Sequence, residues 1–172
     1  HQRIIFNGDG YSNEWIAEAQ RRGLPNIKSM IEAASTITTD KAVALFEKFG
    51  IFTKVELESR EEIIYETYAK TINIEALTMI DMAGKDIIPA VASYAGDLAN
   101  TVIAVKEAGA LAQAQTEMLT EVDSLLAEAK KALNTLKEVE AKGSAIPDAK
   151  EQAFYYKDIV KKAMQALRAP IH

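Results

Sequence analysis

The chain has 172 residues, 48% of them hydrophobic, which is sufficient for one domain with a sizeable core. Asp and Glu outnumber Lys and Arg by 25 to 20, and the resulting net charge of −5 excludes a nucleic-acid binder of the usual kind, because phosphate is bound by clustered Lys and Arg. The chain has no cysteine and no uncharged apolar run near the roughly 20 residues of a membrane span, so we expect a cytoplasmic protein without disulfides, thiolate metal sites or a membrane partner.

Residues 1–52 are expected to form several short helices joined by turns. The sequence Asn7-Gly8-Asp9-Gly10 is typical of a turn, because glycine adopts positive φ and Asn or Asp bonds its own backbone. Glycines at positions 23 and 50 follow helical stretches and are typical of left-handed helix ends. The expected helices and their caps are 14–22 with Ser12 or Asn13, 30–35 with Ser29, and 40–49 with Thr39.

Residues 53–172 are expected to form an antiparallel bundle of long helices. A capping box at Thr53 begins the first of them. The stretch 71–73 predicts a break, because it is β-branched and contains Asn. A further helix is expected over 74–107 with a kink near Pro89, because proline removes one backbone hydrogen bond and clashes with the carbonyl four residues earlier.

Three hydrophobic seams run through this second region, the later two after a reversal at Gly109. Apolar residues three and four apart predict helices that pack along partners, as in a coiled coil. Because three long helices joined by short turns must alternate in direction, the fold class is predicted as all-α with an up-down-up bundle. The seams are Leu77, Ile80, Ile87, Val91, Tyr94, Leu98, Val102 and Val105; Met118, Val122, Leu125, Ala129, Ala132, Leu136 and Val139; and Ala153, Tyr156, Val160, Ala163 and Leu167.

The first turn also fits part of a calcium-binding loop. Asn7, Asp9, Tyr11 and Glu18 occupy positions 1, 3, 5 and 12 of such a loop by count. The sixth position, which needs glycine for a sharp turn, is Ser12, and no helix is expected before the loop. A structural turn is therefore the preferred interpretation.

Carboxylates are abundant in the second region, and two on one helix face could hold a di-metal centre. Bundles of that kind use an inward Glu-x-x-His pattern, which this chain lacks because its only histidines are His1 and His172. The preferred interpretation is that these carboxylates lie on a solvent-exposed helix face and form ordinary ion pairs. Asp81 and Asp86, near the expected kink, are interpreted in the same way, because Asp81 can form an ion pair with Lys85 one helical turn away. The other carboxylates considered are Glu56, Glu58, Glu61, Glu62 and Glu66, the last of which can pair with Lys70.

The sequence does not predict a catalytic nucleophile. A serine would need a histidine base, and none lies between the two ends of the chain. The aromatic residues Phe154, Tyr155 and Tyr156 are interpreted as packing residues, with a ligand-stacking role as the alternative. No catalytic, cofactor-binding or metal-ligating residue is therefore assigned.

Several longer strings resemble the C-terminal region of type III glutamine synthetases, the large bacterial form. They occur in the same order as in that family and together span nearly the whole chain. None of them is short or common, so the resemblance is specific. The strings are Arg3–Trp15, Ile51–Arg60, Thr71–Ile80, Lys85–Val91, and Tyr155–Val160 continuing to Ala163–Arg168.

The resemblance implies a parent enzyme that uses ATP and Mg²⁺ to join glutamate and ammonia into glutamine and that assembles as stacked hexameric rings. It places the metal ligands and the ATP pocket in a β-rich core upstream, so none is carried over to these residues. Residues 1–52 would follow that core, and 53–172 would form a C-terminal bundle that stops earlier than in family members. The start at His1 without Met also predicts a fragment.

We therefore expect a non-catalytic helical part of a glutamine synthetase that serves structure and subunit contacts and is inactive alone. Its expected partners are the upstream catalytic domain of the same chain and further subunits of a homo-oligomer. The alternative is a free-standing helical adaptor that binds a partner through its heptad seams.

Overall fold

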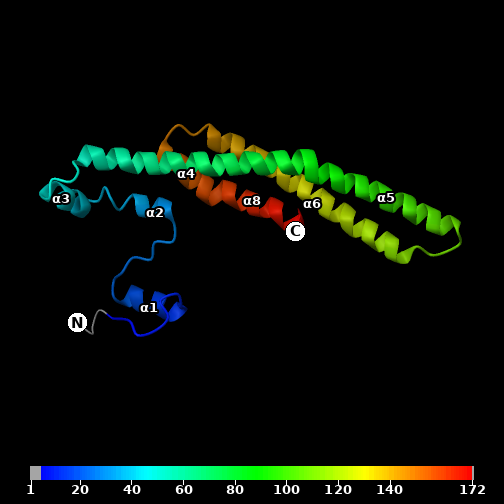
Figure 1. The fold of residues 1–172 in the computed structure, drawn as a ribbon, viewed down its shortest axis with the longest axis horizontal. Helices are drawn as coiled ribbons and strands as arrows, with labels where there is room; N and C mark the ends of the chain where they lie inside the picture. The colour runs from blue at the N-terminus through cyan, green and yellow to red at the C-terminus, as the bar shows by residue number, and fades with distance from the viewer. Residues whose placement is uncertain (1–4, 172) are drawn as a thin grey trace. The chain divides into compact units, whose positions relative to one another are not determined.

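The computed structural model describes residues 5–171, and this part of the chain is helical without a strand (Figure 1). The chain divides into two compact units, His1–Glu61 and Glu62–His172. The boundary between them falls within the first long helix, Lys54–Met82. The sequence-based boundary at 52/53 stays a prediction. The all-α fold class, with short helices followed by long packed ones, is confirmed.

Unit 1 contains three short helices, each capped by the residue that the sequence indicates. The helices are α1 (Asn13–Arg21), α2 (Met30–Ala34) and α3 (Asp40–Lys48). The Oγ atom of Ser12 accepts from the amide of Trp15 at 3.2 Å, and Ser29 and Thr39 accept in the same way three residues on. Caps of this kind satisfy amides that have no partner within the helix.

A charged cluster at the end of α1 ties this helix to the chain before it. The Glu18 carboxylate accepts from Arg21 and from Arg22, each at 2.6 Å, and Arg22 also donates to the carbonyl of Ile5. Hydrogen bonds from Arg21 first and Arg22 second lower the pKa of Glu18 to about 2. Charge pairing therefore stabilises the folded form of α1 at neutral pH.

A pH titration should detect this pairing. Because the pKa of folded Glu18 lies below its ordinary value of 4.5, its stabilising contribution is present above about pH 4.5 and is lost as the pH falls towards 2. Carboxyl NMR shifts should give a midpoint near 2 for Glu18. Replacing both arginines with Gln should return the midpoint towards the ordinary value, and an unchanged midpoint in that variant would contradict the assignment.

The first long helix is α4 (Lys54–Met82), which starts at the predicted capping box. The amide of Thr53 donates to the Glu56 carboxylate at 2.8 Å, and the Glu56 amide donates back to Thr53. The predicted break at 71–73 is wrong. Thr71 instead donates its hydroxyl to the carbonyl of Thr67, and Ile72 is buried, so packing outweighs a small loss of helix propensity.

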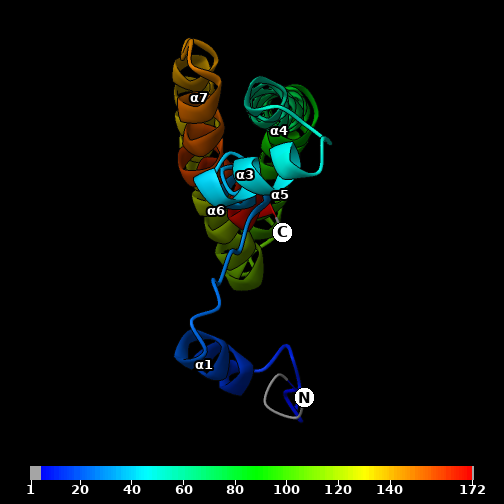
Figure 2. The same ribbon diagram turned by 90° about the vertical axis from the view of Figure 1, so that its left-hand side faces the viewer.

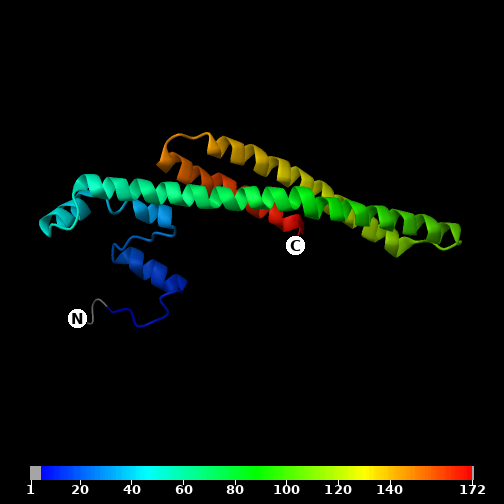
Figure 3. The same cartoon turned by 45° about the horizontal axis from the view of Figure 1, so that its top comes forward.

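A π-helical turn, η2 (Ala83–Ile87), interrupts the long helix directly before Pro89, and α5 (Ile88–Glu107) continues it. The amide of Ile88 bonds the carbonyl of Ala83, five residues earlier, as a π turn requires. The helix changes direction near this turn in Figures 1 and 3, in agreement with the predicted kink. The whole helical run of 54 residues is roughly 80 Å long.

The chain then reverses twice to complete the antiparallel arrangement. Gly109 and Ala112, both at positive φ, form the turn into α6 (Gln113–Ser144). The last long helix consists of α7 (Ala149–Tyr155), the π turn η3 (Tyr156–Val160) and α8 (Lys161–Arg168), followed by a short 3-10 turn, η4 (Ala169–Ile171). Figure 3 shows the alternating directions, and Figure 2 views α4 nearly end-on beside the α6–α7 pair.

The core of unit 2 lies where α4, α6 and the last helix meet. The predicted seam of the last helix is confirmed in full, because all five of its residues are buried. The seam of α6 is buried at Ala129 and Leu136 but left exposed at Met118 and Leu125, and Leu133 was missed. The core cluster consists of Ala69, Ile72, Ala76, Ala83, Leu133, Leu136, Tyr156, Val160, Ala163 and Leu167.

The described residues include one helical run, Lys54–Glu107, that is long and apolar enough in composition to cross a membrane. Length and composition alone do not separate a membrane span from a helix that packs in a protein core. Leu98 and Val102 of this run are buried, and α5 packs along α6. The expectation that the protein has no membrane partner stays a prediction.

Candidate functional site

The turn that resembles a calcium loop is held together by its own atoms. Asp9 accepts through Oδ1 from the amide of Tyr11 at 2.9 Å, and its carbonyl accepts from the Ser12 hydroxyl at 2.7 Å. Glu18, the twelfth position of the loop, is paired with two arginines, and the Tyr11 side chain is 98% exposed. These contacts favour a structural turn over a cation site.

Several carboxylates of α4 are engaged in caps, ion pairs and hydrogen bonds. Glu56 completes the capping box, and its pKa is lowered by hydrogen bonds from the backbone and the hydroxyl of Thr53. Glu66 pairs with Lys70 at 2.6 Å, and Glu61 accepts from the hydroxyl of Thr38. Within residues 5–171 no group of three Asp, Glu, His or Cys side chains is placed to hold a metal ion.

The pair next to the kink is a surface ion pair. Lys85 and Asp81 bond to each other one helical turn apart, and both side chains are more than half exposed. The Asp81 hydrogen bond raises the pKa of Lys85. This is the arrangement that the sequence spacing indicates, and it places no carboxylate inside the bundle.

The aromatic residues of the last helix pack in the core. Tyr156 is 1% exposed, and its hydroxyl has no hydrogen-bond partner among the described residues. Burial raises the pKa of Tyr156. Phe154 lies against the ring of Tyr65 with centroids 6.3 Å apart, and the ring carbons of Tyr155 approach Gly143. These contacts indicate packing and leave no open face for a stacked ligand at Tyr156.

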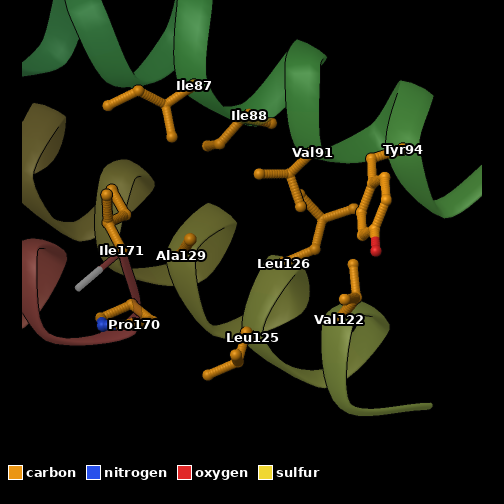
Figure 4. A pocket seen from close by; sticks show the side chains of 10 residues that line it. All are labelled: Ile87, Ile88, Val91, Tyr94, Val122, Leu125, Leu126, Ala129, Pro170 and Ile171. Carbon is orange, nitrogen blue, oxygen red and sulfur yellow. The ribbon is translucent and has the colours of Figure 1, made fainter. Parts of the chain in front are cut away.

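An apolar groove lies between α5 and α6 in unit 2 (Figure 4). It has a volume of about 220 Å³ and begins where the last helix ends, at Pro170 and Ile171. A second apolar hollow beside it shares Ile87 and Ile171. The groove is lined by Ile87, Ile88, Val91, Tyr94, Val122, Leu125, Leu126, Ala129, Pro170 and Ile171.

Sequence reasoning placed several of these groove residues in continuous core seams. The structure leaves Tyr94 47% and Leu125 39% exposed.

The described residues do not fit ATP or Mg²⁺. Among them no polar or charged residue is buried, and the two apolar hollows of unit 2 are lined almost entirely by hydrophobic side chains. Sites for nucleotide phosphates and their metal ions normally bring together backbone amides, carboxylates and a cation in one place. Here the carboxylates lie along helix surfaces in caps and ion pairs.

The chain is similar in sequence to a family of enzyme domains and to several known proteins. The family model described as "Glutamine synthetase C-terminal domain" matches residues 1–106. A glutamine synthetase of Butyrivibrio fibrisolvens is 39% identical over 170 residues, which cover 98% of this chain and 24% of that protein. A type-3 glutamine synthetase of Dictyostelium discoideum is 42% identical over 102 residues, covering 59% of this chain and 14% of that protein.

A third relative also matches nearly the whole chain. A glutamine synthetase of Bacteroides fragilis (strain YCH46) is 30% identical over 171 residues, which cover 96% of this chain and 24% of that protein. The chain thus spans about a quarter of the length of the two relatives that it matches almost end to end.

Proposed function

The chain belongs to the family of glutamine synthetase C-terminal domains, and from this premise we propose that it is a non-catalytic helical part of such an enzyme that provides structure and subunit contacts. One observation carries the proposal: every buried side chain within residues 5–171 is apolar or aromatic. Active sites bring several enclosed polar groups together with set orientation, whereas the buried residues described here are apolar or aromatic. The catalytic groups then belong to other parts of the enzyme.

In this proposal the whole enzyme joins glutamate and ammonia with ATP, and ATP and Mg²⁺ bind outside these residues. The length of the relatives supports this division, because about three quarters of each lies beyond the matched segment. The same length is the reason to prefer a part of an enzyme over a free-standing adaptor. The proposed location, in accordance with this role, is the cytoplasm.

Subunit contacts are proposed on the outer face of α4. Large apolar side chains are exposed on the part of this helix that lies in unit 2, and contiguous exposed apolar surface marks interaction sites in soluble proteins. This face supports a proposed homo-oligomer in which α4 packs against a neighbouring subunit. The exposed residues are Ile63 at 58%, Ile74 at 66%, Leu77 at 47% and Met82 at 51%.

An activity assay tests the division of roles. The 172-residue chain should show no ATP-dependent γ-glutamyl transfer above background, whereas the complete gene product should be active. Ile74→Ser combined with Leu77→Ser in the complete product should lower the assembled fraction in light scattering and leave the KM for glutamate of the assembled enzyme unchanged. Turnover by the isolated chain, or a changed KM without loss of assembly, would contradict the proposal.

A further inference from the structure

The long helical run of unit 2 carries two sets of buried residues that do not lie in line on a regular helix. Five buried residues lead from residue 62 to the start of the π turn η2, and Leu98 and Val102 are buried after the turn. An α-helix turns by about 100° per residue, and on such a helix the centres of the two sets lie about 70° apart. A straight α-helix would therefore turn one set away from a partner that contacts the other. The five residues are Tyr65, Ala69, Ile72, Ala76 and Ala83.

Helix α6 packs against both parts of this run through one unbroken face. Its Leu133 shares the core cluster with Ala76 and Ala83, and α5 packs along α6 after the turn. The inward side chains of α6 are spaced alternately three and four apart without a break, which keeps them on one face. The phase of the long run can therefore be judged against a single continuous partner. The inward residues of α6 are Leu119, Val122, Leu126, Ala129, Leu133 and Leu136, all buried or half-buried.

The apolar seam of the long run contains one surplus residue near η2. Ala69, Ala76 and Ala83 are buried seven residues apart, which is the spacing of a heptad. The corresponding inward residues of α5, Val91 and Leu98, are also seven apart, but each lies one position later than that heptad requires. The surplus residue has therefore entered the seam between Ala83 and Val91.

The π turn lies at the position of the surplus residue. The amide of Ile88 bonds the carbonyl of Ala83, five residues earlier, whereas an α-helix bonds four residues earlier. A turn closed in this way holds one residue more, so the helix after it is rotated back by roughly the angle of one residue. This rotation opposes the offset between the two buried sets. Val91 consequently lines the groove between α5 and α6 together with Leu126 (Figure 4).

We propose that η2 is a register device, which takes up the surplus residue and thereby sets the rotation of α5 so that its seam faces α6. Pro89 does not account for the offset, because a proline removes a hydrogen bond but adds no residue to the seam. The device decides which side chains of α5 lie against α6. It concerns the fold of unit 2 and is independent of the catalytic and subunit roles proposed above.

Removing one residue of η2 tests the proposal, because the π turn can release a residue that a regular helix cannot. Asp86 is the residue to remove, since it is exposed and the other exposed residue of the turn, Lys85, pairs with Asp81. Without Asp86 the amide of Ile88 stands four residues after Ala83, and its hydrogen bond becomes that of an α-helix. The heptad of α4 then continues into α5 in phase.

Removal of Glu75 is the matched control, because it also deletes one exposed carboxylate but takes it from a regular part of α4. Both removals are made in the Pro89→Ala variant of the complete gene product, since proline inside a regular helix carries a cost of its own. Hydrogen exchange measured by mass spectrometry reports the local stability of α4 and α5. Compared with Pro89→Ala alone, exchange should stay within about three-fold without Asp86 and become about ten-fold faster or more without Glu75, which moves buried side chains off their face.

A structure of the Pro89→Ala variant separates the register from the proline. The π turn should persist in this variant, because the surplus residue is still present. A regular α-helix over 83–88 would assign the turn to Pro89 and overturn the proposal. Equal acceleration of exchange by the two removals, or no acceleration by either, would also overturn it, because the tolerance for a lost residue would then not be confined to η2.

Discussion

Tyr156→Ala is expected to lower the free energy of unfolding of unit 2 by about 3–5 kcal/mol, the usual cost of removing a buried aromatic side chain. Tyr156 is among the largest fully buried side chains of the described residues. It lies in the core cluster between α4, α6 and the last helix, so its loss leaves a cavity shared by three helices. Urea unfolding followed by circular dichroism measures the change.

Tyr156→Phe is the matched control, because it keeps the ring and removes only the hydroxyl. The Tyr156 oxygen is buried without a hydrogen-bond partner among residues 5–171, and a buried polar group of this kind costs free energy. The Phe variant should therefore be as stable as the parent or more stable by up to about 1 kcal/mol. A loss greater than about 1 kcal/mol would show that the hydroxyl has a stabilising partner in solution.

Gly143→Ala is expected to destabilise the same unit by about 1–3 kcal/mol, although alanine favours helices. Gly143 is buried near the end of α6, where a Cβ atom would lie 3.1 Å from a ring carbon of Tyr155 and 3.3 Å from one of Tyr156. The Tyr156 ring is 1% exposed and packed in the core cluster, so its displacement would disturb that packing. Crowding therefore outweighs the gain in helix propensity.

Gly96→Ala supplies the comparison for that prediction. Gly96 lies inside α5, and a Cβ atom there meets no other atom within 4 Å. The substitution should stabilise the protein by about 0.5–1 kcal/mol, the difference in helix propensity between the two residues. Thermal melts of both variants measure the two effects, and stabilisation by both would contradict the close packing at Gly143.

Helix ends were predictable because their signals are local. The hydroxyl oxygens of Ser12, Ser29 and Thr39 each cap the helix that follows, and Gly23 and Gly50 adopt positive φ after the helices end. Each signal involves residues at most a few positions apart, and its energy does not depend on the rest of the fold. Local chemistry therefore sufficed to locate these short helices.

The core face of α4 was not predictable in the same way. Its buried residues include Tyr65, Ala69, Ile72 and Ala76, spaced alternately four and three apart, whereas the larger Ile74 and Leu77 are exposed. A search for large apolar residues favours the exposed face, because alanine gives a weak hydrophobic signal. Which face packs was decided by the shape of the neighbouring helices, which accept small residues at close approach.

The sequence by itself determined that this protein is helical, where most of its helices begin and end, and that its last helix packs through five regularly spaced residues. Those properties follow from capping, periodicity and composition, which act over short separations. Only the tertiary structure decided that α4 runs through 71–73 and that Ala69, Ile72 and Ala76, not Ile74 and Leu77, form the buried face of this helix. Both depend on contacts between residues far apart in the chain, whose energies outweigh local preference.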